Sequence, residues 1–140
     1  MSKVNLGRVV LGGVLAGLLI NVSEFVLNGF VVAADMEAAM RARNLPPLDN
    51  MMVIWFVVLG FLLGIATVWA YAAIRSRFGP GVRTAATAGV FVWLLGYVYP
   101  NVGMGVIDVF PARLLIIVTC WGLPEIIIAS IAGAWAYTEA

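Results

Sequence analysis

The stretch that decides the fold is residues 50–74, NMMVIWFVVLGFLLGIATVWAYAAI, which contains no charged side chain. A helix that crosses a bilayer needs about 20 consecutive apolar residues, so this stretch predicts a membrane span. Residues 84–107 form a second uncharged stretch of the same kind. Residues 9–34 and 114–138 are equally long and apolar, and each is interrupted by a single glutamate. We therefore predict four transmembrane helices.

Composition supports lipid as the surroundings of the chain. It has 140 residues, of which 64% are hydrophobic and 11% charged, whereas soluble domains have about 45 to 50% and about 25%. The predicted fold class is all-α, a polytopic membrane protein built as a bundle of four transmembrane helices, with one domain covering residues 1–140. The lipid bilayer is the first predicted partner.

Several classes of function are disfavoured by what the sequence lacks. The net charge of +1 gives no basic patch for nucleic acid. Histidine is absent and Cys120 is the only cysteine, so no metal centre, haem ligand or intrachain disulfide is expected. The hydroxyls of Ser23, Thr119 and Ser130 have no histidine as a base. We predict no catalytic residues, no enzyme activity, no cofactor and no nucleic-acid partner.

A polar segment interrupts the apolar pattern after the first span. Residues 35–45 predict a short helix outside the membrane, with Asp35 as its N-cap and Pro46 and Pro47 as its end. The segment 75–83, RSRFGPGVR, predicts a tight turn, because its glycines and proline break the helix. We take the first span as a permanent helix rather than a cleaved signal peptide, because its apolar stretch is too long.

The distribution of Lys and Arg predicts orientation. Five basic residues fall on the side of the termini and three on the other, which favours a multi-pass protein of the cell inner membrane with both termini in the cytoplasm. The five are Lys3, Arg8, Arg75, Arg77 and Arg83, and the three are Arg41, Arg43 and Arg113.

The chain also shows signs of an internal repeat. A shift of 66 residues superimposes 69–71, Trp-Ala-Tyr, on the same triplet at 135–137, and a shift of 76 aligns glycine and aliphatic positions of the first and third spans. This pattern favours two repeated helical hairpins, repeat one at 1–80 and repeat two at 81–140. The alternative is that membrane helices resemble one another through shared composition.

An intramembrane polar site is the one candidate for chemistry. A carboxyl inside the bilayer is costly and must face the bundle or another subunit, and each glutamate lies near the centre of its span. One interpretation is a proton or cation site, because two adjacent carboxyls can share a proton. The other is that both are permanently protonated and join helices by hydrogen bonds. The candidate residues are Glu24, Glu125, Asn21, Asn28, Tyr97 and Asn101.

Small residues four positions apart predict close helix packing, within one chain or between copies. Prolines 100 and 124 fall inside spans and predict bends. The candidate packing residues are Gly13 with Gly17, Gly60 with Gly64, and Ala129 with Gly133.

Three segments carry a family resemblance: GGVLAGLLINVSEFVLNG at 12–29 with the polar helix after it, VWLLGYVYPNVG at 92–103, and VFPARLLIIVTCWGLPEIIIASIAGAWAY at 109–137. With them the chain resembles a bacterial family of small four-span membrane proteins that carry a domain of unknown function. The resemblance implies the four-span layout and no particular activity.

Two functions fit these patterns. The first is a non-enzymatic structural or accessory subunit of a membrane assembly, with other membrane subunits as partners, or of a homo-oligomer. The second is a small proton- or cation-coupled transporter or channel that uses Glu24 and Glu125.

Overall fold

The computed structural model describes residues 3–138, which form helices and no strand. Four helical spans are long and apolar enough to cross a membrane, namely Leu6–Val31, Asn50–Phe78, Val82–Val106 and Ala112–Ala136. The predicted all-α, four-span membrane architecture is thus confirmed. The elements are α1 (Leu6–Val26), the π-helical turn η1 (Leu27–Val31), α2 (Ala33–Ala42), α3 (Asn50–Phe78), α4 (Val82–Trp93), the π-helical turn η2 (Leu94–Val98), α5 (Tyr99–Val106) and α6 (Ala112–Ala136).

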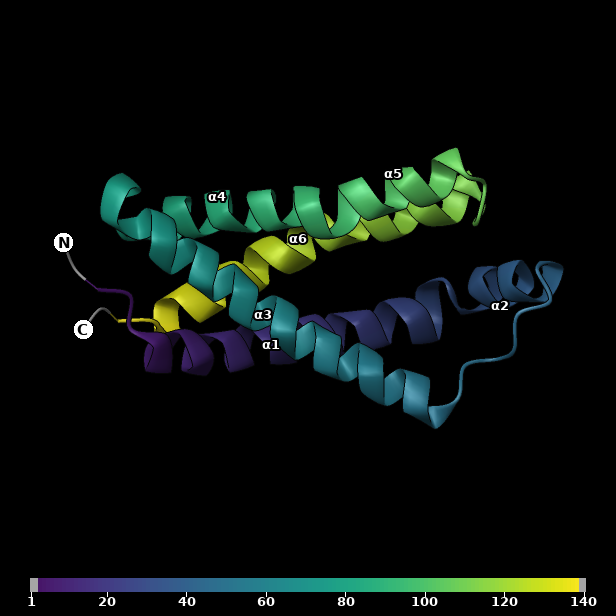
Figure 1. The fold of residues 1–140 in the computed structure, drawn as a ribbon, viewed down its shortest axis with the longest axis horizontal. Helices are drawn as coiled ribbons and strands as arrows, with labels where there is room; N and C mark the ends of the chain where they lie inside the picture. The colour runs from purple at the N-terminus through teal and green to yellow at the C-terminus, as the bar shows by residue number, and fades with distance from the viewer. Residues whose placement is uncertain (1–2, 139–140) are drawn as a thin grey trace.

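The spans form an elongated bundle with two distinct ends (Figure 1). Both termini and the turn between α3 and α4 lie at one end, here called the terminus end, while α2 and the corner between α5 and α6 lie at the other, the α2 end. Helix α1 packs against α3 and α6, and α4 packs against α6. The predicted turn between α3 and α4 requires glycine, because Gly79 and Gly81 have φ of 83° and 128°.

The terminus half of the bundle is held together by glycines. A Cβ added to Gly64 on α3 would lie 2.5 Å from the carbonyl oxygen of Gly13 on α1, and one added to Gly133 on α6 would lie 2.9 Å from the carbonyl oxygen of Gly12. Helix α1 therefore approaches both neighbours at backbone distance, which larger residues would prevent.

The α2 half is more open. Helix α3 crosses α1 and then diverges from the bundle toward the α2 end (Figure 1). Residues 50–59 of α3 are exposed at every position. The bundle is therefore tight at one end and splayed at the other.

The polar helix differs from its prediction at both ends. It spans Ala33–Ala42, and its N-cap is Val32 with no side-chain cap, so the assignment of Asp35 as N-cap was wrong. Val32, whose φ is −113° and ψ 6°, separates the helix from η1, and Asp35 lies in the first turn of the helix, 3.9 Å from the Arg113 guanidinium. Its end is set before the prolines by Asn44, whose φ is 54°, with Leu45 N–H donating to the Met40 carbonyl.

Both intramembrane prolines sit at irregularities. The Tyr99 N–H donates to the carbonyl of Leu94, five residues back, so the wide turn η2 comes directly before Pro100. Helix α6 changes direction near its middle (Figure 1), and Pro124 lies inside that helix. A proline cannot donate a helix hydrogen bond and its ring crowds the preceding turn, which accounts for both features.

Candidate functional site

A polar cluster joins three helical elements in the middle of the bundle. Glu125 on α6 is 7% exposed and accepts two hydrogen bonds from hydroxyls. The Tyr97 hydroxyl, on η2, donates to its Oε1 at 2.5 Å, and the Ser23 hydroxyl, on α1, donates to its Oε2. The Trp121 Nε1–H, one helical turn before Glu125, donates to Ser23 Oγ at 2.9 Å. The cluster therefore links α1, η2 and α6.

Three polar side chains surround the Glu125 carboxyl. Ser23 Oγ accepts a hydrogen bond from the Trp121 N–H and is the partner of Glu125 Oε2. The Tyr97 hydroxyl is the partner of Oε1. A hydroxyl can donate to a carboxylate or accept from a protonated carboxyl. The site therefore fits Glu125 in either protonation state.

The second carboxyl lies beside the first. Glu24 is half-buried on α1, next to Ser23, and close enough for its charge to act on Glu125. The Asn28 side chain orients Glu24 by donating at 2.9 Å to its Oε2 and to its backbone carbonyl. The site therefore holds two neighbouring intramembrane carboxyls.

Four of the six predicted polar residues come together here: Glu24, Glu125, Asn28 and Tyr97. The other two do not. The Asn21 side chain donates at 3.2 Å to the backbone carbonyl of Val57, where α1 crosses α3. The Asn101 side chain donates at 2.9 Å to Thr119, which ties α5 to α6. Both amides join helices rather than contribute to the carboxyl pair.

Sequence reasoning missed two members of the cluster. Ser23 was considered only as a nucleophile, and Trp121 was not among the predicted site residues. Helical spacing was the available signal for Trp121, because it lies four residues before Glu125 and so shares its face. Nothing comparable marked Ser23, whose partners come from α6.

The predicted packing residues lie at helix contacts. Gly13 and Gly17 face Ile65, Phe61 and Gly60, and Gly60 packs on the Asn21 side chain. Ala129 is fully buried in the core, and Gly133 lies against Val68 and Gly12. All six predicted packing residues thus pack against other parts of the same chain. The two glycine pairs pack α1 against α3, and Gly133 packs α6 against both α1 and α3.

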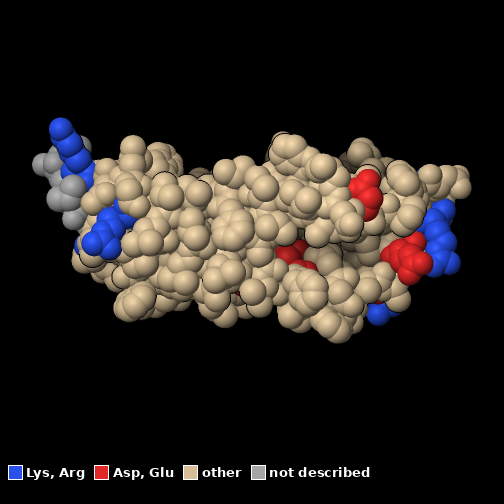
Figure 2. Space-filling model, turned by 90° about the horizontal axis from the view of Figure 1, so that it is seen from below, with Lys and Arg blue, Asp and Glu red and all other residues tan. Residues whose placement is uncertain are grey.

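The carboxyl pair lies between two buried apolar clusters. Toward the terminus end, the cluster includes Ala16, Ile20 and Ile126. Toward the α2 end, it includes Leu27, Val32 and Leu114. Glu24 and Glu125 are the two acidic residues inside the four spans. Seen from below, the surface of the bundle has a hollow toward the α2 end with acidic atoms at its edge (Figure 2).

No protein-family model, curated protein or solved structure matches this chain.

Proposed function

We propose that the chain is a small proton-coupled membrane carrier in which Glu24 and Glu125 form one proton-exchanging pair. The observation that carries this proposal is that the site provides for both protonation states of Glu125. The Ser23 and Tyr97 hydroxyls can donate to the carboxylate or accept from the acid. A second carboxyl, Glu24, follows Ser23 in the chain, and two neighbouring carboxyls can share one proton.

The route to the pair follows from burial. A proton that reaches the pair from outside the bundle meets Glu24 first, because this carboxyl is half-buried whereas Glu125 is buried. Transfer inward then passes between the two carboxyls. In this proposal, release at the terminus end requires the glycine-packed half of α1 to separate from α3 and α6.

Proteoliposome flux tests this role. A pH-sensitive dye inside the vesicles reports proton entry under an imposed potential. The wild type should acidify the lumen, and Glu24→Gln and Glu125→Gln should fall to the level of empty vesicles. Glu37→Gln, on exposed α2, is the matched control and should keep full flux. Absence of wild-type flux with every counter-ion tested would contradict the role, as would full flux in both span variants.

The orientation that we propose has both termini in the cytoplasm. It rests on the five basic residues at the terminus end against three at the α2 end. In a Cys120→Ala background, Ser76→Cys should be shielded in intact cells from a membrane-impermeant maleimide, whereas Glu37→Cys should react. Both positions are exposed. The reverse labelling pattern would invert the topology.

A structural or accessory role is the second proposal. Its support is that residues 50–59 of α3 are exposed on every side, Trp55 and Phe56 among them. A second copy of the chain packed on this half of α3 would cover those side chains. Mass measurement in mild detergent tests it, and a monomer with wild-type behaviour in lipid would contradict it.

A further inference from the structure

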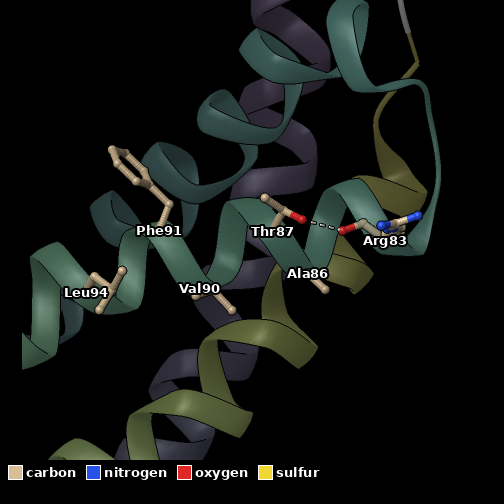
Figure 3. Close-up of a pocket in the computed structure, with 6 residues that line it drawn as sticks. All are labelled: Arg83, Ala86, Thr87, Val90, Phe91 and Leu94. Atoms are coloured by element: carbon tan, nitrogen blue, oxygen red, sulfur yellow. Dashed lines mark hydrogen bonds between the residues drawn. The ribbon is translucent and has the colours of Figure 1, made fainter.

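A shallow groove runs along the outer face of α4. It is lined by one charged residue and five small or apolar ones: Arg83, Ala86, Thr87, Val90, Phe91 and Leu94 (Figure 3). The residues of α4 that pack into the bundle lie on the opposite face, and they are Thr84, Ala85, Ala88, Gly89 and Val92. The groove therefore faces the lipid.

The shape of the groove comes from side-chain size. Arg83, Thr87 and Phe91 form one ridge at four-residue spacing, and Ala86, Val90 and Leu94 form the other. The small side chains of Ala86 and Thr87 leave the hollow between them. The Thr87 hydroxyl donates at 2.9 Å to the Arg83 carbonyl (Figure 3), so it needs no further partner. The groove is therefore apolar along its length, with a cation at one end.

Its length matches one leaflet. Eleven residues separate Arg83 from Leu94, which is about 16 Å of helix at about 1.5 Å per residue. Half of a bilayer core of about 30 Å is about 15 Å. Arg83 is the second residue of its span, so we expect it at headgroup level. An acyl chain in this groove would end near the middle of the membrane.

Charge favours an anionic headgroup. Lys3, Arg8, Arg75, Arg77 and Arg83 lie at the terminus end, where the described residues include no Asp or Glu, and Figure 2 shows basic atoms without acidic ones there. Within residues 3–138, the Arg83 guanidinium forms no ion pair. Helix α4 also begins without a side-chain cap, which leaves its positive end toward the headgroups.

We propose that the α4 groove binds one anionic phospholipid, with its phosphate on Arg83 and an acyl chain between Ala86 and Leu94. This site is independent of the carboxyl pair and does not rest on proton transport.

Native mass spectrometry of the full chain in mild detergent tests the site, with phosphatidylglycerol and phosphatidylcholine as probes. The wild type should retain the anionic lipid in preference to the zwitterionic one. Arg83→Gln should weaken the retention about fivefold, the effect expected of one basic residue near an anionic surface. Arg41→Gln, an exposed arginine at the α2 end, is the matched control and should change nothing.

Two further measurements distinguish binding of the lipid headgroup from binding of its acyl chain. Ala86→Leu fills the groove, keeps Arg83 and should also weaken retention of phosphatidylglycerol. Inorganic phosphate should not displace the lipid. Equal retention of both lipids by the wild type, or unchanged retention in Arg83→Gln, would overturn the site. Unchanged retention in Ala86→Leu, or displacement by phosphate, would overturn the acyl-chain part. An unaltered melting temperature confirms that each variant is folded.

Discussion

Ser23 on α1 and Glu125 on α6, 102 positions apart in the chain, are joined by a hydrogen bond in the interior of the bundle. Trp121 donates to the same serine from α6, so Ser23 Oγ contacts two residues one helical turn apart on α6. Glu24 follows Ser23 on α1, and its charge acts on Glu125. The contact between α1 and α6 thus places both carboxyls in one region of the bundle.

The Tyr97 hydroxyl should contribute measurably to stability. Tyr97→Phe removes one of the two donors to a carboxyl that is 7% exposed, and leaving a buried acceptor unsatisfied costs about 1 to 3 kcal/mol. Unfolding by a denaturing detergent should occur earlier in this variant. Tyr99→Phe is the control, because Tyr99 is 78% exposed, and it should leave unfolding unchanged. Equal behaviour of the two variants would contradict the account of the cluster.

The glycine contact between α1 and α3 should not tolerate a methyl group. In Gly64→Ala the new Cβ would lie 2.5 Å from the Gly13 carbonyl oxygen and also meet the Gly17 backbone. Overpacking of this kind costs about 1 to 3 kcal/mol, so the melting temperature in detergent should fall. A Cβ on Gly103 meets nothing within 4 Å, and Gly103→Ala should melt like the wild type. A Gly64→Ala protein of unchanged stability would show that the helices are farther apart.

Arg43 should hold the polar helix α2 against the corner between α5 and α6. Its guanidinium donates to the carbonyls of Ala39 and Asp108 at 3.3 and 3.2 Å, and lies 5.6 Å from the centre of the Phe110 ring. Arg43→Gln should therefore speed hydrogen exchange across Ala33–Ala42.

The comparison for that variant is Arg41→Gln. Arg41 pairs with Glu37 on the exposed side of the same helix, and an exposed ion pair contributes about 0 to 1 kcal/mol. Its exchange should stay close to that of the wild type. If both variants exchange alike, Arg43 does not anchor α2.

Much of the fold could be predicted from apolar length alone. The uncharged stretches 50–74 and 84–107 lie within the observed spans, since bilayer thickness fixes how long such a helix must be. The turn at Gly79 and Gly81 could be predicted because glycine has no Cβ and adopts positive φ without steric strain, as both residues do here. The cap of α2 could not, because only Val32, with a non-helical backbone and no capping side chain, separates η1 from α2. The duplication of hairpins stays a prediction.

The two carboxyls of the site could be predicted from the sequence, whereas most of the side chains that form hydrogen bonds with them could not. Two glutamates inside apolar spans stand out in any sequence, and helix spacing placed Asn28 on the face of Glu24. Asn21 and Asn101 look equivalent in sequence, yet the crossing of α1 over α3 and the contact of α5 with α6 turn them to other partners. The rotation of each helix about its axis decides this, and tertiary packing sets that rotation.

The most direct test of the central claim is infrared spectroscopy of the protein in lipid, with the glutamate carboxyls isotopically labelled, followed from acid to alkaline pH. If Glu24 and Glu125 form a proton-exchanging pair, a protonated carboxyl band should disappear as pH rises, and Glu24→Gln and Glu125→Gln should each alter that transition, because the two sites share one proton. A protonated band that persists unchanged across the whole range would contradict the claim and identify the glutamates as permanent hydrogen-bonding links between helices.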